Sequence, residues 1–272
     1  MAKNAAVIGH PIAHSKSPRI HNYWLQQNGL AAQYTAIDIA PDALAAQIPL
    51  LLADENLAGF NITLPHKEKI MAFCDVLDPS AKAIGAVNTI YKNDQGQVVG
   101  ANTDAYGFWQ NIAAAYPDFS VKDQTVFILG AGGAARAVIY AIKEQGAGRI
   151  VICNRTRSKA EYLAEEFGAE ICDWADAAAA LAECCLLVNT TSLGMYGQDP
   201  LSLDISALPQ NALVNDIVYA PLQTELLQKA AARGNKYVQG IGMLLYQAQK
   251  AFHFWYGIWP EVDAQLQKDV LQ

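Results

Sequence analysis

The chain has 272 residues, of which 52% are hydrophobic and 17% charged; this is typical of a folded globular protein and excludes a disordered one. A net charge of -7 at pH 7 argues against general nucleic-acid binding, which needs a basic face to neutralise phosphates, but leaves room for a small basic pocket for one phosphorylated ligand. No apolar run approaches the length of a membrane span. We therefore expect a small molecule as the partner, rather than a nucleic acid or a membrane, and enough chain for two modest domains.

The cysteines indicate a reducing compartment. They are odd in number, form no CxxC pair, and have spacings that suit neither zinc nor a disulfide framework: Cys74, Cys153, Cys172, Cys184 and Cys185. The first residues also lack the apolar core and cleavage site of a signal peptide. We expect idle thiols, no metal site and a cytoplasmic location.

Strand and helix signals alternate along the first hundred residues. A buried strand is predicted at 5–8, and Ser17-Pro18 predicts a helix start with Ser17 as N-cap and Pro18 as the first helical residue. Further predictions are a helix end near 28–29, strands at 34–39 and 57–62, a helix opened by Pro41, and a hairpin of 86–91 and 98–100 around 93–96. Such alternation predicts a mainly parallel sheet covered by helices.

A second alternating unit begins near Gln124. It predicts strands at 125–129 and 149–153, a helix at 134–145 between them, further strands at 186–189, 212–215 and 236–238, and an alanine-rich helix at 175–182. Apolar residues from Ile241 to Trp255 have helical periodicity over several turns, and the aromatic cluster at 252–259 is typical of a core or a subunit contact. The fold class predicted is α/β with two domains.

A glycine-rich turn lies between the strand at 125–129 and the helix that follows. Its sequence is Gly130-Ala131-Gly132-Gly133-Ala134-Ala135. Gly130 would allow the tight turn, Gly132 would let the backbone approach a pyrophosphate at the helix N-terminus, and Ala135 would take the third small position. A purely structural turn is the alternative. The order strand, turn, helix, strand favours a Rossmann-type dinucleotide site.

The residues after the strand at 149–153 indicate which dinucleotide is bound. An acidic residue there would bind the ribose hydroxyls of NAD, but the sequence is Asn154-Arg155-Thr156-Arg157-Ser158-Lys159. Arg155, Thr156 and Arg157 could hold the 2′-phosphate of NADP. The alternative is a solvated helix start with Thr156 as N-cap. Cations oppose the dipole of a helix N-terminus, and an anionic ligand would remove that conflict, so NADP is favoured over NAD.

Lys67 and Asp104 are the candidate catalytic residues. Lys67 is predicted in the first turn of a helix opened by Pro65, where the helix dipole would disfavour its positive charge and help it to donate a proton to an alkoxide. Asp104 precedes a helix at 105–115 and could either cap it or position Lys67. His10 and His14 lie in a turn without a metal motif, and His66 is expected to cap or pack.

Several separated motifs, in order and nearly from end to end, resemble the shikimate dehydrogenase family. They are Ile8-Gly-His-Pro-Ile-Ala-His-Ser15-Lys-Ser17-Pro18-Arg-Ile-His-Asn22, Asn61-Ile-Thr63-Leu-Pro-His-Lys67, Gly85-Ala-Val-Asn88-Thr with Asn102-Thr-Asp104, and Gly240-Ile-Gly-Met-Leu-Leu-Tyr-Gln247. The glycine turn, Asn154-Arg-Thr156 and Asn189-Thr-Thr-Ser-Leu-Gly-Met195 lie between them.

The resemblance implies reversible, NADP-dependent reduction of 3-dehydroshikimate to shikimate, in the route to aromatic amino acids. It implies that Ser15, Ser17 and Tyr219 bind the substrate carboxylate, that Thr63, Asn88, Asp104 and Gln247 bind the ring hydroxyls, and that Lys67 is the acid–base residue beside Asp104. The implied cofactor residues are Gly130, Ala131, Gly132, Gly133, Ala134, Asn154, Arg155, Thr156, Arg157, Thr190, Ile217 and Gly240.

The resemblance also implies the domain organisation. Residues 1–103 and 240–272 would form the substrate domain, residues 104–239 a Rossmann-type NADP domain, and the substrate would lie in the cleft between them. Monomers and homodimers both occur in the family. Two other interpretations stay open: a quinate/shikimate dehydrogenase with relaxed cofactor use, and a non-catalytic dinucleotide-binding regulator. A regulator would have no use for Lys67, Asp104 and the paired serines.

Overall fold

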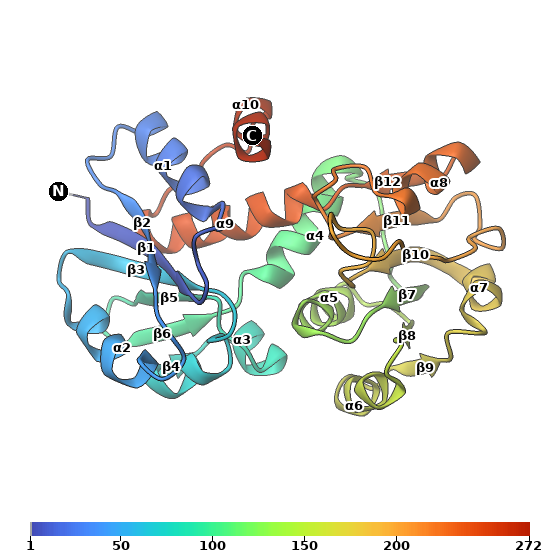
Figure 1. Cartoon of the computed structure of the whole chain (residues 1–272), viewed down its shortest axis with the longest axis horizontal. Helices are drawn as coiled ribbons and strands as arrows, with labels where there is room; N and C mark the ends of the chain where they lie inside the picture. The colour runs from blue at the N-terminus through green and yellow to red at the C-terminus, as the bar shows by residue number, and fades with distance from the viewer. Residues whose placement is uncertain (1) are drawn as a thin grey trace. The chain divides into compact units, whose positions relative to one another are not determined.

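The computed structural model describes residues 2–272, which divide into two compact units (Figure 1). Unit 1 comprises residues 2–107 and Leu245–Gln272, and unit 2 comprises Phe108–Leu244. The chain leaves unit 1 within helix α4 (Asp104–Ala115) and returns within helix α9 (Ile241–Tyr256), whereas the predicted domain boundaries lie just before these helices. No helix formed by residues 2–272 is long and apolar enough to cross a bilayer.

Unit 1 is built on a six-stranded sheet with the order β2-β1-β3-β5-β6-β4. The strands are β1 (Asn4–Gly9), β2 (Tyr34–Asp38), β3 (Leu57–Ile62), β4 (Val76–Leu77), β5 (Thr89–Lys92) and β6 (Val98–Ala101). β1 pairs in parallel with β2 and β3, and β4 with β6, whereas β5 is antiparallel to both β3 and β6. The predicted hairpin is therefore confirmed, and it makes the sheet mixed.

The helices of unit 1 begin slightly away from the predicted positions. They are α1 (Ser17–Gln27), α2 (Leu44–Ala53), the 3-10 helix η1 (Lys69–Phe73), α3 (Pro79–Ile84), the later part of α9, and α10 (Ala264–Leu271). The N-cap of α1 is Lys16, so the prediction of Ser17 as N-cap is wrong by one residue. The reason is local: the Ser15 hydroxyl oxygen accepts the Ser17 N–H at 3.3 Å, which places Ser17 inside the first turn.

The predicted helix opened by Pro65 is not formed. A turn occupies this stretch, and η1 begins only at Lys69. The Lys67 carbonyl accepts the N–H of Val87 at 2.8 Å, and it is therefore turned toward the rest of the sheet rather than along a helix. Lys67 therefore does not lie in the first turn of a helix, and the expectation that a helix dipole disfavours its positive charge does not hold. Pro41 likewise precedes α2 by a turn instead of opening it.

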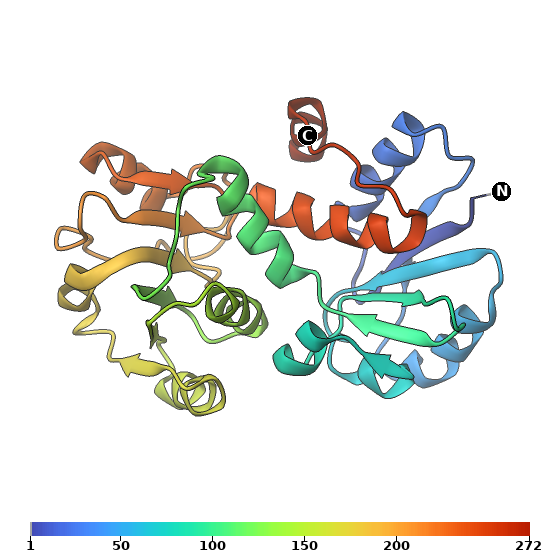
Figure 2. The same ribbon diagram turned by 180° about the vertical axis from the view of Figure 1, so that it is seen from behind.

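Helix α9 packs against the sheet of unit 1 at a glycine. The indole Nε1 of Trp255 donates to the carbonyl of Ile90 at 3.0 Å. A Cβ at Gly59, on the neighbouring strand β3, would lie 2.1 Å from that carbonyl oxygen and 2.3 Å from the indole nitrogen. Helix α9, although late in the sequence, thus packs on a sheet that the first hundred residues form. Figure 2 shows the red ribbon of α9 beside this sheet.

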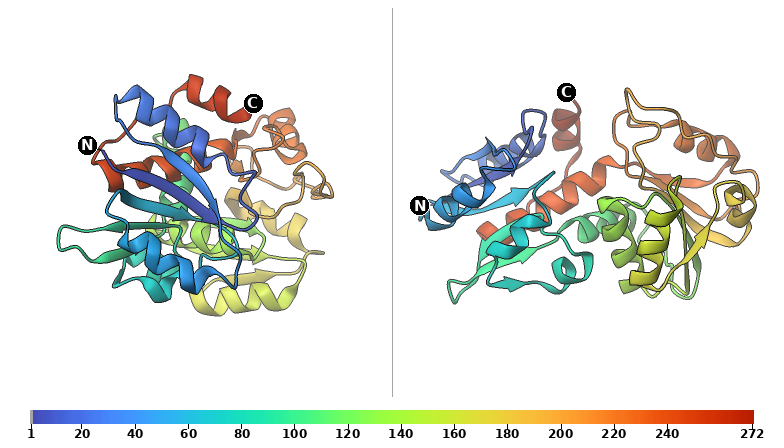
Figure 3. Two further views of the ribbon diagram at one scale, coloured as in Figure 1. Left: turned by 60° about the vertical axis from the view of Figure 1, so that its left-hand side comes forward. Right: turned by 60° about the horizontal axis from the view of Figure 1, so that its bottom comes forward.

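Unit 2 contains a wholly parallel six-stranded sheet with the order β9-β8-β7-β10-β11-β12. Its strands carry labels in Figure 1, and Figure 3 gives two further views of the ribbon. The strands are β7 (Thr125–Leu129), β8 (Arg149–Cys153), β9 (Glu170–Cys172), β10 (Cys184–Asn189), β11 (Leu213–Asp216) and β12 (Lys236–Val238). The connecting helices are α5 (Gly133–Glu144), α6 (Arg157–Phe167), α7 (Ala177–Ala180) followed by η2 (Leu181–Glu183), and α8 (Glu225–Arg233). Numbered from β7, this order is 3-2-1-4-5-6, the doubly wound Rossmann arrangement.

The reversal of strand order in unit 2 fixes where a ligand can bind. The chain moves outward from β7 to β9, and then crosses back to β10 on the other side of β7. In open parallel sheets, ligands bind at such a switch point, outside the carboxyl ends of the strands. β7 and β10 are fully buried along most of their length, so their ends are held rigidly.

Candidate functional site

A lysine–carboxylate pair forms the centre of a polar cluster in unit 1. The Lys67 Nζ lies 2.6 Å from Asp104 Oδ2, and the amide Nδ2 of Asn88 donates to Asp104 Oδ1 at 2.8 Å. The side chains of Lys67 and Asp104 are 27% and 19% exposed, so a small molecule can still reach them. Both carboxylate oxygens of Asp104 are occupied by other side chains, which is not the geometry of a plain helix cap.

The backbone around Asp104 is fixed by Asn102. The side-chain oxygen of Asn102 accepts the Asp104 N–H at 3.0 Å, and its amide nitrogen donates to the carbonyl of Ala86 at 3.0 Å. Asn102 is almost fully buried. It thereby joins the start of α4 to the segment that carries Asn88.

Two further predicted residues lie in the same unit. The Gln247 Oε1, on α9, accepts a hydrogen bond from the Thr103 hydroxyl at 3.3 Å, next to Asp104 in the chain. Thr63 follows β3, and its N–H donates to the carbonyl of Ile8 at 2.9 Å. A Cβ at Gly9 would come within 2.5 Å of the Thr63 side chain, so this approach requires glycine.

The serines of the first motif lie at the start of α1. Both are partly buried, and Ser15 Oγ accepts the Ser17 N–H. Seven of the eight predicted substrate residues are thus in unit 1: Ser15, Ser17, Thr63, Lys67, Asn88, Asp104 and Gln247. The eighth, Tyr219, follows β11 in unit 2, where burial raises the pKa of its phenol.

The predicted cofactor residues all follow carboxyl ends of strands in the parallel sheet of unit 2. The glycine turn follows β7, Asn154 to Arg157 follow β8, and Thr190, Ile217 and Gly240 follow β10, β11 and β12 respectively. β7 and β10 flank the switch point, so Gly130 and Thr190 begin the two loops on either side of it. The structure therefore gathers on one edge of the sheet residues that are far apart in the sequence.

The glycine turn is closed on one side and open on the other. Gly130 has φ +107°, and a Cβ there would lie 2.5 Å from the Thr190 hydroxyl oxygen, which donates to the carbonyl of Leu129. Gly132 and Gly133 are exposed, and a Cβ at either would meet nothing within 4 Å. Gly132 is the N-cap of α5, whose first N–H groups point into this space. The pyrophosphate of a dinucleotide fits such a site.

The two arginines after β8 differ in how they are engaged. Arg157 forms ion pairs with Glu161 and Asp173. Arg155 is exposed and, within residues 2–272, has no hydrogen bond or ion pair to another residue. Thr156 is the N-cap of α6, but its side chain makes no capping bond. Arg155 and Thr156 therefore keep their polar groups available for an anion.

One buried carboxylate at this edge was not predicted from the sequence. Asp216, the last residue of β11, accepts hydrogen bonds from the side chains of Asn189 and Thr224 and from the Val218 N–H, at 2.9, 2.6 and 3.0 Å. Burial raises the pKa of Asp216 to about 6. It joins the ends of β10 and β11 to the N-cap of α8. An acidic residue ending an apolar strand was the signal available in the sequence.

Gly240 is held tightly against the loop after β11. A Cβ at Gly240 would lie 2.3 Å from the carbonyl oxygen of Ile217 and 2.7 Å from that of Val218. The Ile217 N–H in turn donates to the carbonyl of Asn189 at 3.1 Å. These contacts join the ends of β10, β11 and β12 into one surface.

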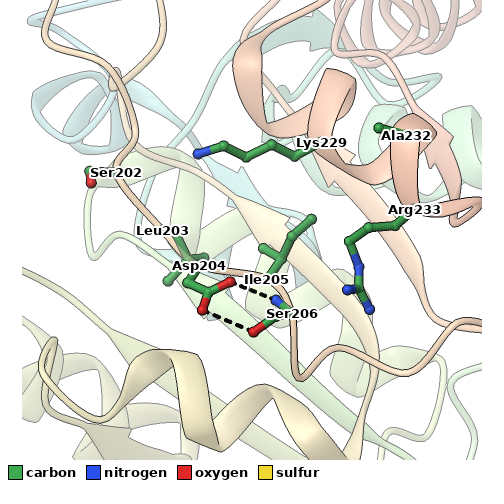
Figure 4. A pocket seen from close by; sticks show the side chains of 8 residues that line it. All are labelled: Ser202, Leu203, Asp204, Ile205, Ser206, Lys229, Ala232 and Arg233. Carbon is green, nitrogen blue, oxygen red and sulfur yellow. Dashed lines mark hydrogen bonds between the residues drawn. The ribbon is translucent and has the colours of Figure 1, made fainter.

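A surface hollow of about 540 Å³ in unit 2 contains none of the predicted residues (Figure 4). It is lined by Ser202, Leu203, Asp204, Ile205, Ser206, Lys229, Ala232 and Arg233. Its cations are already engaged: Lys229 pairs with Glu225, and Arg233 donates to the carbonyl of Leu208 at 2.7 Å. Asp204 receives two hydrogen bonds from Ser206, drawn as dashed lines in Figure 4.

Comparison with known proteins gives two family matches and many relatives. The model described as "Shikimate dehydrogenase substrate binding domain" matches residues 7–90, and that described as "Shikimate / quinate 5-dehydrogenase" matches residues 112–196. A shikimate dehydrogenase (NADP(+)) from Paramagnetospirillum magneticum is 47% identical over 272 residues, which cover 99% of this chain and 98% of that protein.

Solved structures give the same result in three dimensions. The shikimate 5-dehydrogenase of Thermus thermophilus, in complex with NADP(H) and shikimate, is similar with a TM-score of 0.87 and 36% identity, covering 99% of this chain and 98% of that one. A quinate dehydrogenase from Corynebacterium glutamicum, in complex with NAD, is similar with a TM-score of 0.87 and 29% identity, covering 99% of each chain.

Proposed function

Because the chain belongs to the shikimate dehydrogenase family, we propose that it catalyses the reversible, NADP-dependent reduction of 3-dehydroshikimate to shikimate. The observation that carries this proposal is the pairing of Lys67 with Asp104 at 2.6 Å, in the unit that the substrate-binding family model matches. A non-catalytic dinucleotide-binding protein would have no use for this pair.

Unit 1 would bind the substrate. Ser15 and Ser17 offer hydroxyl donors at the start of α1, which suits a carboxylate. Thr63, Asn88, Asp104 and Gln247 offer a mixture of donors and acceptors, which suits the hydroxyls of a sugar-like ring. Tyr219 would contribute from unit 2. Residues 1–103 and 240–272 would then form the substrate domain, and 104–239 the cofactor domain.

Lys67 would move the proton. When bound, the nicotinamide supplies or accepts the hydride at the ring carbon that carries the reacting oxygen. During reduction that oxygen gains negative charge, and the Lys67 ammonium donates a proton to it; in the reverse direction the neutral amine accepts the proton. Asp104, hydrogen-bonded on its other oxygen by Asn88, would keep the Lys67 Nζ directed and stabilise its charged form.

Unit 2 would bind NADP. The open space over Gly132 and Gly133 would receive the pyrophosphate, with donors from the first turn of α5. Arg155, which pairs with no other residue of the described part of the chain, and Thr156 would hold the 2′-phosphate, and no acidic residue stands among residues 154–159 to bind the ribose diol of NAD. Asn154, Arg157, Thr190, Ile217 and Gly240 would line the same edge of the sheet.

Quinate with NAD is the second candidate pair, because a quinate dehydrogenase in complex with NAD has a similar structure. The basic segment after β8 and the paired serines favour NADP and shikimate. The location we propose is the cytoplasm, which five free cysteines support. Monomer and homodimer are both compatible, since one chain carries every proposed residue.

The test is a spectrophotometric assay of the purified protein with four substrate and cofactor combinations. We expect nicotinamide reduction with shikimate and NADP, and much slower reduction with quinate or with NAD. Activity mainly with quinate or NAD would move the chain to the quinate-using group. No turnover in any arm, from folded protein that binds NADP, would overturn the proposed reaction and leave only cofactor binding.

A further inference from the structure

Behind the proposed acid–base pair lie three buried polar side chains that the proposed function does not use. They are Tyr34 at the start of β2, Asn61 on β3 and Thr89 at the start of β5, with exposures of 2%, 6% and 0%. Removing polar groups from water is costly unless each finds a partner. All three do, and the partners connect them in a line that ends on Asp104.

The line begins at the Tyr34 hydroxyl, which donates to Asn61 Oδ1 at 2.6 Å. Burial raises the pKa of this phenol well above its ordinary value, so the hydroxyl keeps its proton to donate. Because the oxygen of the Asn61 amide is used here, its nitrogen faces the other way. It donates to the Asn88 carbonyl at 3.1 Å and to the Thr89 hydroxyl oxygen at 2.9 Å.

The next two hydrogen bonds run in the same donor-to-acceptor direction, from Thr89 to Asn88 and from Asn88 to Asp104. The Thr89 hydroxyl accepts from Asn61 and has only one proton, which it donates to Asn88 Oδ1 at 2.9 Å. The backbone N–H of Thr103, which can only donate, also points to this oxygen at 2.8 Å. The amide nitrogen of Asn88 must therefore face Asp104 Oδ1.

Two backbone groups make this assignment of amide orientations independent of the proposed reaction. The Asn88 carbonyl can only accept, so the Asn61 atom beside it is nitrogen; the Thr103 N–H can only donate, so the Asn88 atom beside it is oxygen. Each amide has one orientation that satisfies all of its neighbours. A rotated Asn88 amide would place an oxygen against the carboxylate of Asp104.

We propose that Tyr34, Asn61 and Thr89 are positioning residues for the acid–base pair, because together with the Thr103 N–H they hold the Asn88 amide in the orientation that donates to Asp104 and leaves the other carboxylate oxygen to Lys67. This inference rests on the proposed function. None of the three touches the pair directly: they act through Asn88. Their effect should fall mainly on the rate of turnover, because the hydrogen bond that they hold runs from Asn88 to Asp104 and not to the substrate.

The experiment compares Thr89→Val with Thr89→Ser. Valine keeps the shape of the side chain but cannot continue the line, whereas serine keeps the hydroxyl. We expect Thr89→Val to lower kcat about fivefold to tenfold, the effect of one net hydrogen bond, with KM for shikimate changed by less than about twofold. Thr89→Ser should restore kcat to within about twofold of the wild-type value.

Tyr34→Phe tests the far end of the line, with Tyr256→Phe as its matched control. Tyr256, in the same unit, donates its hydroxyl proton to the carbonyl of Lys3 at 3.0 Å rather than to a member of this line. We expect Tyr34→Phe to reproduce the kcat loss of Thr89→Val and Tyr256→Phe not to do so. The Ser17 hydroxyl also interacts with that of Tyr34, so Tyr34→Phe changes the surroundings of Ser17 as well. The main comparison is therefore between Thr89→Val and Thr89→Ser.

A measurement without turnover separates failure of this inference from failure of the proposed function. The side-chain amide resonances of Asn88, assigned by their loss in Asn88→Asp, should shift in Thr89→Val and remain near their wild-type positions in Thr89→Ser. Unshifted resonances in Thr89→Val, or folded Thr89→Val with wild-type kcat, would overturn the positioning role. An inactive wild-type protein with shifted resonances would overturn the reaction and keep the hydrogen-bonded line.

Discussion

At the scale of single residues, Lys67 has the most demanding role. We predict that Lys67→Ala lowers kcat by about 10²- to 10⁴-fold, because it removes the group that would exchange a proton with the substrate oxygen. KM for shikimate should change little, since other side chains would hold the carboxylate and the ring. Steady-state kinetics on both parameters measures this, and near-normal turnover would remove Lys67 from the mechanism.

Arg155 and Arg157 provide a second test at this scale. We predict that Arg155→Ala raises KM for NADP by about tenfold or more, as expected for loss of a charge-assisted hydrogen bond, with little change for NAD. Arg157→Ala is the matched control, because Arg157 is engaged by Glu161 and Asp173 and should contribute less. Equal effects of Arg155→Ala on the two cofactors would refute contact with the 2′-phosphate.

At the scale of helices and strands, glycines decide where two elements can approach. A Cβ at Gly242, on α9, would lie 1.8 Å from Asn111 Oδ1 on α4, and the Asn111 amide also donates to the carbonyl of Gln239 at 2.8 Å. We predict that Gly242→Ala lowers the free energy of unfolding by about 1–3 kcal/mol, because the clash exceeds the gain in helix propensity.

Chemical denaturation measures this change, with Gly132→Ala as the control. Gly132 has open space around it, so alanine there should leave the stability of the ligand-free protein within about 0.5 kcal/mol while weakening NADP binding. If Gly242→Ala were as stable as the wild-type protein, the contact between α4 and α9 would not require glycine at position 242.

The sequence was sufficient for several elements but not for all of them. The strands at 125–129, 149–153 and 236–238 are confirmed to the residue. β4 and β9 have only two and three residues and were not predicted, and neither were the helices α8 and α10. β4 and β9 form because β6 and β8 supply their pairing.

The candidate site could likewise be predicted from the sequence only in part. Lys67 and Asp104 could be named as candidates from their local sequence, but their 2.6 Å contact joins residues 37 positions apart and depends on the whole sheet. The predicted helix at Lys67 was wrong because a local rule for proline competed with a tertiary bond from Val87 to the Lys67 carbonyl. Asp216 was overlooked although it ends an apolar strand, because that signal does not show which partners would hold the carboxylate.

At the scale of the whole molecule, Asp216 should make stability depend on pH in an unusual direction. Its folded pKa of about 6 lies above its ordinary value of 3.8, so the folded protein binds the proton more tightly than the unfolded chain. The stability that this provides is fully present below about pH 4 and is lost as pH rises through 6. A carboxylate with a lowered pKa would behave in the opposite way.

We predict that the free energy of unfolding of the wild-type protein, relative to Asp216→Asn, falls by on the order of 3 kcal/mol between pH 4 and pH 7. Asparagine has no titration in this range, and the other carboxylates are common to both proteins and cancel in the difference. Urea unfolding at several pH values measures it. A pH-independent difference would show that Asp216 has the same proton affinity folded and unfolded.

The division of unit 1 between two distant segments has a consequence for synthesis on the ribosome. Unit 2 is continuous, so it can fold as soon as Leu244 has emerged. Unit 1 cannot: His21 and Tyr34 pack against Trp255, and Trp255 donates to Ile90, so its core stays incomplete until α9 is made. The part of unit 1 that is translated first therefore matures after unit 2, and Lys67, although made early, acquires its complete setting only once α9 has emerged.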